Sequence, residues 1–427
     1  MSPAREAARR ITRLSATGIL LALGVVYLVA GIHRNLVPVG PGLANRVGTR
    51  VGDDFSAFYA VAREVTRGRA RAVYAEDALR EAHARAIGAE APRYQWAYPP
   101  TAGVLLAPLA LLEPLAAYWT WTAAALAVAL IALFRATRDA PVAALALVFP
   151  GVAHAMICNP TGLTHMALLA VAMAALGTRP ALAGVATALL TYKPHLAWLP
   201  PLAFASAGRR RALAAWMLAA LALPLVSLLA FGLGAWGDFL AAARLNVAHV
   251  DAGRLPLDRM PTPYAALLSN GAAPRVAAAG QLLVTAMAAL AVVHVWRRSP
   301  RLGVSALALA AATPIATPYA YDYDMAMLAV PFVLLAAERR AGAAVPAWVL
   351  AALWVGPLLV PLVAQASGWH LGLPLLGALL AWAVHETAPS GSGGAATERL
   401  PQPRQTPRPG GSVPPARQSR GAPRLPA

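Results

Sequence analysis

Long apolar runs alternate with short polar segments along most of the chain. A helix that crosses the hydrocarbon core of a bilayer needs about 20 apolar residues, and many of these runs reach or approach that length. The pattern therefore predicts an all-α polytopic membrane protein, a bundle of about 10 to 12 transmembrane or half-membrane helices. We expect the apolar spans at residues 14–32, 101–112, 114–134, 141–157, 163–176, 180–207, 212–233, 274–296, 302–318, 322–337, 345–364 and 370–384.

The polar segments divide the chain into regions. Residues 1–13 are rich in arginine, so we expect a cytoplasmic N-terminus. Residues 14–387 form the membrane domain, with two large exterior loops at 33–98 and 234–273. The tail 388–427 consists mainly of Pro, Gly, Ser and Arg and cannot bury enough apolar surface to offset its ordering entropy. We expect a disordered cytoplasmic tail, either solvated or in contact with anionic lipid head groups.

The first apolar span, 14–32, follows a basic segment and so also has the features of a signal peptide. No clear small-x-small cleavage site follows it, and many further spans do. We therefore expect an uncleaved first helix.

Composition supports the membrane class and narrows the function. Only 13% of the residues are charged and 59% are hydrophobic, whereas soluble domains have about 25% charged residues. The net charge of +18 comes from arginines in short clusters between the apolar runs, which is the positive-inside pattern. Because no RNP motif or basic helix with interleaved aromatic residues is present, we exclude nucleic-acid binding. Cys158 is the single cysteine, so no internal disulfide is possible.

One apolar segment conflicts with a simple alternation of sides. The positive-inside rule places both Arg179 and the cluster at 209–211 in the cytoplasm, yet a single apolar run, 180–207, separates them. A hairpin resolves the conflict if it breaks at Lys193 and Pro194, because proline lacks an N–H and clashes with the preceding turn. Each limb is then too short to cross a bilayer of about 30 Å at 1.5 Å per residue.

Lys193 is the only lysine in the chain. Non-helical backbone at membrane depth is tolerated where it is buried in protein or lines a wet cavity, which predicts that Lys193 and His195 face a polar cavity. The alternative is a lysine that extends to the interface beside an ordinary kink.

Two adjacent acids open an amphipathic helix in the first exterior loop. Apolar residues at helical spacing follow Asp53 and Asp54, and charged residues occupy the other faces. We expect this helix to lie on the membrane surface. Aspartate is a preferred N-cap, so either acid can cap the helix; the alternative is a catalytic carboxylate at the mouth of a membrane cavity.

A second pair of acids, Asp322 and Asp324, stands among tyrosines in the stretch "TPIATPYAYDYDMAML". An interfacial aromatic belt accounts for the tyrosines, and Asp322 can cap the next helix while Asp324 points inward. The chain contains none of the nucleotide-binding, zinc or serine-hydrolase motifs, and we expect neither a metal nor a cofactor.

Taken in order, several motifs resemble glycosyltransferase family 87. They are Asp-Phe-x-x-Phe-Tyr from Asp54, a helix that ends at Tyr74 after Gly68, Tyr-Pro-Pro from Tyr98, Lys193-Pro194, and Pro-Tyr-x-x-Asp-Tyr-Asp from Pro318 to Asp324. The resemblance covers roughly residues 50 to 335. Two stretches depart from the family pattern: the turn at 158–162 and "RMPTPYAALLSNG" in the second exterior loop.

The resemblance implies a GT-C fold and a membrane enzyme that transfers a hexose, expected to be mannose, from a polyprenyl-phosphate sugar. The acceptor would be a lipid- or glycan-linked hydroxyl on the exterior face of the plasma membrane. The transfer in this family inverts the anomeric centre. Asp54 matches the family's aspartate before phenylalanine and is the expected base, with Asp53 as the alternative; Lys193 and His195 are expected to meet the donor phosphate. Further substrate contacts are expected from Tyr59, Tyr98, Tyr319, Asp322 and Asp324.

A secondary transporter is the alternative function. Broken helices and ionisable residues within the membrane are also typical of that class. The long amphipathic first loop and the absence of a repeated half favour the transferase.

Overall fold

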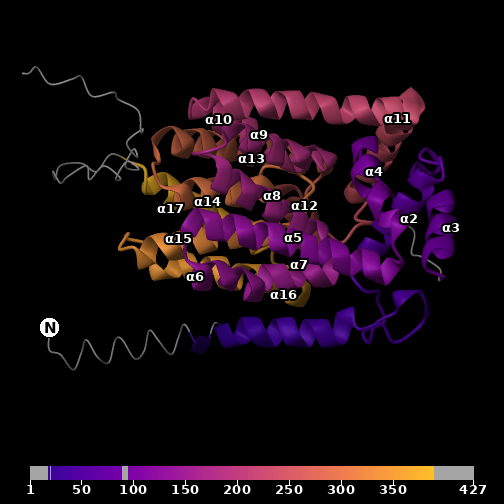
Figure 1. Ribbon diagram of the computed structural model, residues 1–427, viewed down its shortest axis with the longest axis horizontal. Coiled ribbons are helices and arrows are strands. Elements are labelled where there is room, and N and C mark those ends of the chain that lie inside the picture. Colours follow the sequence, from indigo (N-terminus) through magenta and orange to yellow (C-terminus); the bar gives the residue numbers. More distant parts are fainter. Residues whose placement is uncertain (1–17, 20, 89–94, 389–427) are drawn as a thin grey trace, which may run out of the picture. The chain divides into compact units, whose positions relative to one another are not determined.

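The computed structural model describes residues 18–19, 21–88 and 95–388, all within one compact unit, Met1–Ala388. The expected cytoplasmic N-terminus and all of the tail beyond residue 388 lie outside the described residues. The described residues form helices and connecting turns, with one isolated bridge between Ala44 and Arg50 (Figure 1).

The helices follow in this order. The first half contains the first apolar helix Leu21–Leu36, whose last turn is η1 (Ile32–Leu36), then η2 (Pro41–Leu43), α2 (Phe55–Thr66), η3 (Ala72–Tyr74), α3 (Glu76–Ile87), α4 (Pro100–Leu106), η4 (Ala107–Leu111), α5 (Pro114–Thr137), α6 (Ala140–Ala144), η5 (Leu145–Val148), α7 (Pro150–Cys158), α8 (Thr161–Ala175), α9 (Pro180–Ala188) and η6 (Leu189–Tyr192). The second half contains η7 (Pro194–Leu196), α10 (Leu199–Ser206), α11 (Arg210–Asp251), η8 (Leu257–Arg259), α12 (Pro263–Ser269), α13 (Pro274–Arg298), α14 (Leu302–Ile315), η9 (Asp322–Leu328), α15 (Ala329–Arg340), α16 (Ala347–Ser367) and α17 (Gly372–His385).

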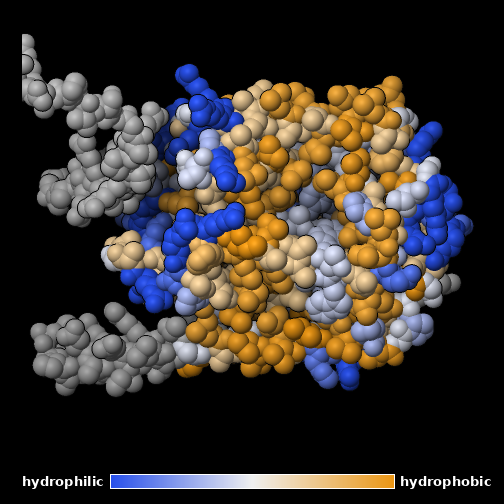
Figure 2. All heavy atoms as spheres, viewed as in Figure 1, coloured by the Kyte–Doolittle hydropathy of each residue, from blue (hydrophilic) through white to orange (hydrophobic). Residues whose placement is uncertain are grey.

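Four of these helices, α5, α11, α13 and α16, are long and apolar enough to cross a membrane, within the part of the chain that the structure describes. The bent helix pair at residues 140–158 gives a fifth span if it is treated as a single crossing. The described residues also include six shorter apolar helices. Hydrophobic residues gather over the middle of the bundle and hydrophilic ones at its two ends (Figure 2). The predicted class, an all-α polytopic membrane protein, is confirmed.

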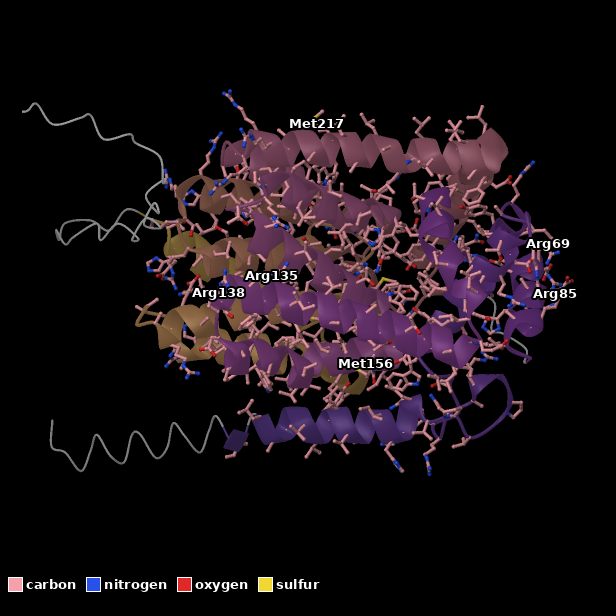
Figure 3. All side chains as sticks on the ribbon, viewed as in Figure 1. Arg69, Arg85, Arg135, Arg138, Met156 and Met217 are labelled. Atoms are coloured by element: carbon pink, nitrogen blue, oxygen red, sulfur yellow. The ribbon has the colours of Figure 1, made fainter. Side chains whose placement is uncertain are left out.

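The two ends of the bundle carry different arginines. Arg135 and Arg138 lie at one end, and Arg69 and Arg85, from the first polar loop, lie at the opposite end (Figure 3). This separation agrees with the expectation that Arg135 and Arg138 lie in the cytoplasm and that the long loop 33–98, which is exempt from the positive-inside rule, lies on the exterior side.

The predicted span 141–157 is broken in the structure. Its two parts, α6 with η5 and then α7, meet at an angle of 44°. Phe149 has an extended backbone before Pro150, because a residue that precedes proline is disfavoured in the helical region.

The predicted hairpin is present. Lys193 has φ −126° and ψ 76°, which ends the helical path of α9 and η6, and η7 and α10 follow. Close contact between α9 and the start of α11 shows that the chain returns to the end from which the hairpin began. A Cβ atom at Gly184 in α9 would lie 2.1 Å from the carbonyl oxygen of Ala212 in α11. Close packing of α9 against the start of α11 therefore holds Lys193 at the far end of the hairpin.

One expectation is wrong. The amphipathic helix α2 does not lie on a surface, since nine of its twelve residues are buried and it packs against α3, α4 and η4. The segment 234–273, expected to be an exterior loop, is largely helical, because α11 continues to Asp251 through a stretch rich in the helix formers alanine and leucine. Gly232, with φ 75° and ψ 170°, interrupts α11 where the apolar run ends.

Candidate active site

A tight turn presents the two acids of the first exterior loop to the interior. Gly52 and Asp53 both have positive φ, 69° and 43°, and a Cβ atom at Gly52 would lie 2.6 Å from the ring of Tyr118. Positive φ is costly for a non-glycine residue and is often found at functional sites. The turn delivers Asp54 to the first position before α2.

Asp54 occupies the N-cap position, but its side chain makes no capping hydrogen bond. Its backbone N–H donates to the Cys158 carbonyl at 3.1 Å, and its carboxylate accepts from the Asn159 amide at 3.2 Å. The capping alternative is therefore wrong for this side chain, and the carboxylate is directed toward the α7–α8 turn.

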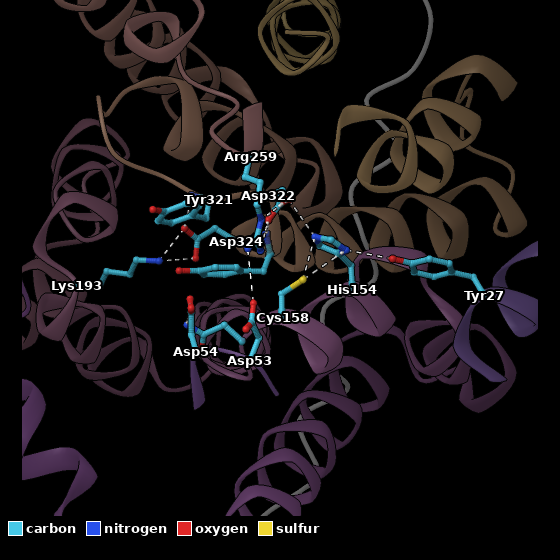
Figure 4. Close-up of polar contacts among 12 residues, drawn as sticks. Tyr27, Asp53, Asp54, His154, Cys158, Lys193, Arg259, Tyr321, Asp322 and Asp324 are labelled. Carbon is cyan, nitrogen blue, oxygen red and sulfur yellow. Dashed lines mark hydrogen bonds and ion pairs between the residues drawn. The ribbon is translucent and has the colours of Figure 1, made fainter. Parts of the chain in front are cut away.

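Lys193 and Asp324 form a buried ion pair. The lysine Nζ lies 2.8 Å from each carboxylate oxygen of Asp324, and both side chains are 0% exposed (Figure 4). Asp324 is also 3.0 Å from Nδ1 of His165 and accepts from the backbone N–H of Tyr321. Lys193 is thus not extended to an interface, and that alternative is wrong.

Asp322 forms the second buried acid centre, also 0% exposed. It lies 3.2 Å from Nε2 of His154, and it accepts two hydrogen bonds from the guanidinium of Arg259 at 3.2 and 3.3 Å. His154 in turn contacts the hydroxyl of Tyr27 at 3.1 Å, which ties the first helix to this centre.

Arg259 is the main residue that the sequence interpretation missed. It lies 3.8 Å from Asp53 as well as against Asp322, so one guanidinium connects both aspartate pairs (Figure 4). Its side chain is 20% exposed, whereas Lys193 is fully buried. The sequence offers little to distinguish it from the other arginines of the exterior loops, although it falls in a stretch where the chain departs from the family pattern.

Aromatic rings surround these charges. Tyr321 and Tyr323 stack with centroids 5.3 Å apart, and Nζ of Lys193 lies 4.8 Å from the centre of the Tyr323 ring. Tyr319 packs edge-on against both Tyr321 and His195. These rings limit the water that reaches the buried ion pair.

Tyr98 and Tyr59, the two remaining predicted residues, have different surroundings. Tyr98 packs against Phe58 and Trp96, and burial raises its pKa, with further contributions from Tyr319 and Asp54. Tyr59 is 1% exposed and donates its hydroxyl to the carbonyl of Leu112, in the hydrophobic core. The cluster therefore includes Tyr98 but not Tyr59.

The electrostatic environment makes Asp54 more basic than an ordinary aspartate. Burial and, next, the neighbouring Asp53 carboxylate raise the pKa of Asp54 from 3.8 to about 6, although Arg259, Asn159 and Lys193 act in the opposite direction. Burial also raises the pKa of Asp53. Asp54 can therefore accept a proton near neutral pH, as a general base must.

Two cavities adjoin the cluster. One, of about 560 Å³, is lined by Asp53, Arg259 and His154, with the first helix and α16 as walls. The other, of about 650 Å³, is a mainly apolar groove along α11 and α13. His195 and Tyr319 line this groove, and Nε2 of His195 is buried without a hydrogen-bond partner. Among the described residues, no group of three or more His, Cys, Asp or Glu is placed to hold a metal ion.

Comparison with known families decides the class. The model for glycosyltransferase family 87 matches residues 96–318, slightly more than half of the chain. The chain belongs to glycosyltransferase family 87. No curated protein and no solved structure matches it.

Membership in family 87 makes this chain a membrane glycosyltransferase with a sugar donor and an acceptor, and it favours transfer over transport. The matched range includes Tyr98, Lys193, His195 and Arg259. All four aspartates of the cluster lie outside that range, so their assignment depends on the geometry described above.

Proposed function

We propose that the protein transfers a hexose, mannose in the first instance, from a polyprenyl-phosphate sugar to a hydroxyl of a lipid- or glycan-linked acceptor on the exterior side of the plasma membrane. The observation that carries the proposal is the Asp54 carboxylate, which has a raised pKa and lies in a buried cluster of cations and aromatic rings. A membrane groove adjoins this cluster.

The reaction is a single displacement that inverts the anomeric centre. Asp54 takes the proton of the acceptor hydroxyl as its oxygen bonds to the anomeric carbon. The bond from that carbon to the phosphate oxygen breaks, and the polyprenyl phosphate leaves with the electron pair. A positioned base of this kind contributes about 10²–10⁴-fold to the rate.

The donor would lie along the groove between α11 and α13, because its apolar lining suits a polyprenyl chain. His195 at the inner end has an unpartnered ring nitrogen for the phosphate. Lys193 supplies positive charge from behind the Tyr323 ring, although Asp324 already shares that charge. Fixed charges in a site that excludes water stabilise a leaving group more strongly than they would in water.

Tyr98, Tyr319, Asp322 and Asp324 remain our proposed substrate-binding residues, and Arg259 joins them. Tyr98 and Tyr319 are close enough to Asp54 to interact with it electrostatically. We leave Tyr59 out, because its hydroxyl is already bound to a backbone carbonyl.

Membranes that contain the protein should transfer label from a radiolabelled polyprenyl-phosphate hexose to an extractable acceptor. Membranes with Asp54→Asn should not. A panel of polyprenyl-phosphate sugars identifies the donor, and analysis of the labelled product identifies the acceptor. Transfer that requires a nucleotide sugar instead would overturn the proposed donor.

The orientation can be tested separately. In a Cys158→Ala background, cysteines at positions 179 and 209 should both react with a membrane-impermeant maleimide only after the cytoplasmic side is opened. A cysteine at Arg85, at the opposite end (Figure 3), should react in intact cells. The reverse pattern would place the site in the cytoplasm.

A further inference from the structure

A single side chain, Asn159, connects the α7–α8 turn to the Asp54 carboxylate. Asn159 follows the last residue of α7 and is 0% exposed. Its Oδ1 accepts from the backbone N–H of Thr161 at 3.0 Å, and its Nδ2 donates to Oδ2 of Asp54 at 3.2 Å. Because the turn occupies the amide oxygen, the amide nitrogen must face the carboxylate.

The same turn holds Asp54 through the main chain. The backbone N–H of Asp54 donates to the carbonyl of Cys158, the residue before Asn159. Asp54 itself has no capping bond that would fix its side chain to α2. The Asp54 carboxylate is therefore oriented by the α7–α8 turn, which lies about 100 residues further along the chain.

The turn is in addition packed tightly against the other acids. A Cβ atom at Gly162 would lie 2.3 Å from the carbonyl oxygen of Tyr323, between Asp322 and Asp324. This leaves the turn little room to move relative to η9. The distance from Asp54 to the Lys193–Asp324 pair is thus set through residues 158–162.

We propose that Asn159 is a positioning residue that orients the Asp54 carboxylate and favours its ionised form. The proposal rests on the function proposed above, in which Asp54 is the base. An amide donor held in place by Thr161 stabilises a carboxylate more than a neutral acid. Without it, the Asp54 side chain would be free to rotate and would bind a proton more tightly.

Among the groups that face Asp54, Asp53 is the one that can titrate over the same range. Arg259 and Lys193 are cations that lower the pKa of Asp54, while Asp53 raises it. The remaining neighbours are tyrosine hydroxyls, whose ordinary pKa is about 10; they are Tyr98, Tyr319, Tyr321 and Tyr323. Asp53 has a raised pKa of its own, so the experiment includes an Asp53 variant.

The test is the pH dependence of kcat/KM for hexose transfer by the full-length protein in nanodiscs. Asn159→Ser keeps an oxygen that can accept from Thr161 but is too short to reach Asp54. We expect the acid limb of its profile to move upward by about one pH unit, so that raising the pH restores most of the lost activity. The limb should move by the same amount in the Asp53→Asn background. The matched control is Asn270→Ser, at an exposed asparagine after α12. This variant should leave the pH profile unchanged.

A purely structural role predicts a different result. Loss of activity by the same factor at every pH, or an unchanged profile, would overturn the proposal. Should Asn159→Ser fail to fold, Asn159→Gln retains an amide donor and should keep the acid limb near that of the parent; a limb displaced as far as in a donor-free variant such as Asn159→Ala would count against the role. Activity of Asp54→Asn would instead contradict the proposed base, and with it this inference.

Discussion

Glu64 and Asp54 are acids with opposite surroundings. Glu64 in α2 is 1% exposed and is surrounded by three arginines at 2.6–3.6 Å whose side chains remain 39–47% exposed. These are Arg67, Arg69 and Arg85. At the active site, Asp54 lies partly buried beside a second acid, Asp53, and the Arg259 guanidinium comes no closer than 3.8 Å to Asp53.

The difference shows what each cluster contributes. An acid with an excess of cations stabilises the fold, and Glu64 joins α2 to α3 through Arg85. An acid without enough cations costs stability in a buried site, because its charge is only partly compensated. That same shortage keeps Asp54 basic, and perturbed acids of this kind are typical of functional sites.

The largest effect should come from Asp54→Asn. We expect transfer to fall by about 10²–10⁴-fold, with donor binding and expression retained, because asparagine preserves the shape and no cap is lost. Asp53→Asn should be milder. Steady-state transfer assays and a donor-binding assay on the same preparations measure both, and near-normal turnover of Asp54→Asn would show that the base lies elsewhere.

Lys193→Met should destabilise the protein, because it leaves the Asp324 carboxylate buried without its cation. Breaking one partner of a buried pair costs about 3–5 kcal/mol. The double variant with Asp324→Asn should recover most of that stability but not the activity. Thermal unfolding in detergent distinguishes the two, and equal stability of the single and double variants would mean that the pair is not a source of stability.

Asp54→Asn should also change the stability in a pH-dependent way. The folded-state pKa of Asp54 is about 6 against an ordinary value of 3.8, so the folded protein binds the proton more tightly and loses stability as the pH rises through that window. The asparagine variant lacks this loss. It should be more stable than the parent by up to about 3 kcal/mol at pH 7.5 and equally stable near pH 4, as measured by unfolding in matched detergent buffers.

Glu64→Gln should give the smallest effect of these variants. Unlike Asp54→Asn, it should lower stability and leave catalysis nearly unchanged. We expect a loss of about 1–2 kcal/mol in stability, since charge-assisted hydrogen bonds from Arg69 become neutral ones. Transfer activity per folded molecule should stay within about twofold of the parent, a change of at most about 0.4 kcal/mol. A strong loss of activity without a loss of stability would mean that the two clusters are not separate in function.

Features that depend on neighbouring residues could be predicted from the sequence. The break at Lys193 followed from a proline and from arginine clusters on both sides, and the structure has that break. The acids before Phe55 were recognised from the helical pattern that follows them. Periodicity could not show that α2 is covered by α3, α4 and η4, because a protein surface and a membrane surface both select an apolar face.

Features that depend on distant pairs could not be predicted. Lys193 and Asp324 are 131 residues apart in the chain, and Arg259 and Asp322 are 63 apart. Nothing local marks either pair, so the sequence showed neither the ion-pair partner of Lys193 nor a role for Arg259. The helical extension of α11 beyond Gly232 was missed because a glycine at the end of an apolar run resembles a helix end.

The burial of Lys193 also determines how the protein reacts with amine-directed reagents. The chain has no second lysine, and this one is 0% exposed behind an ion pair. Acylating and cross-linking reagents that need a free lysine amine should therefore leave the described part of the folded protein untouched. Modification at Lys193 would then mark molecules in which the centre of the bundle has opened, so the one amine of the site can serve as a chemical reporter of its integrity.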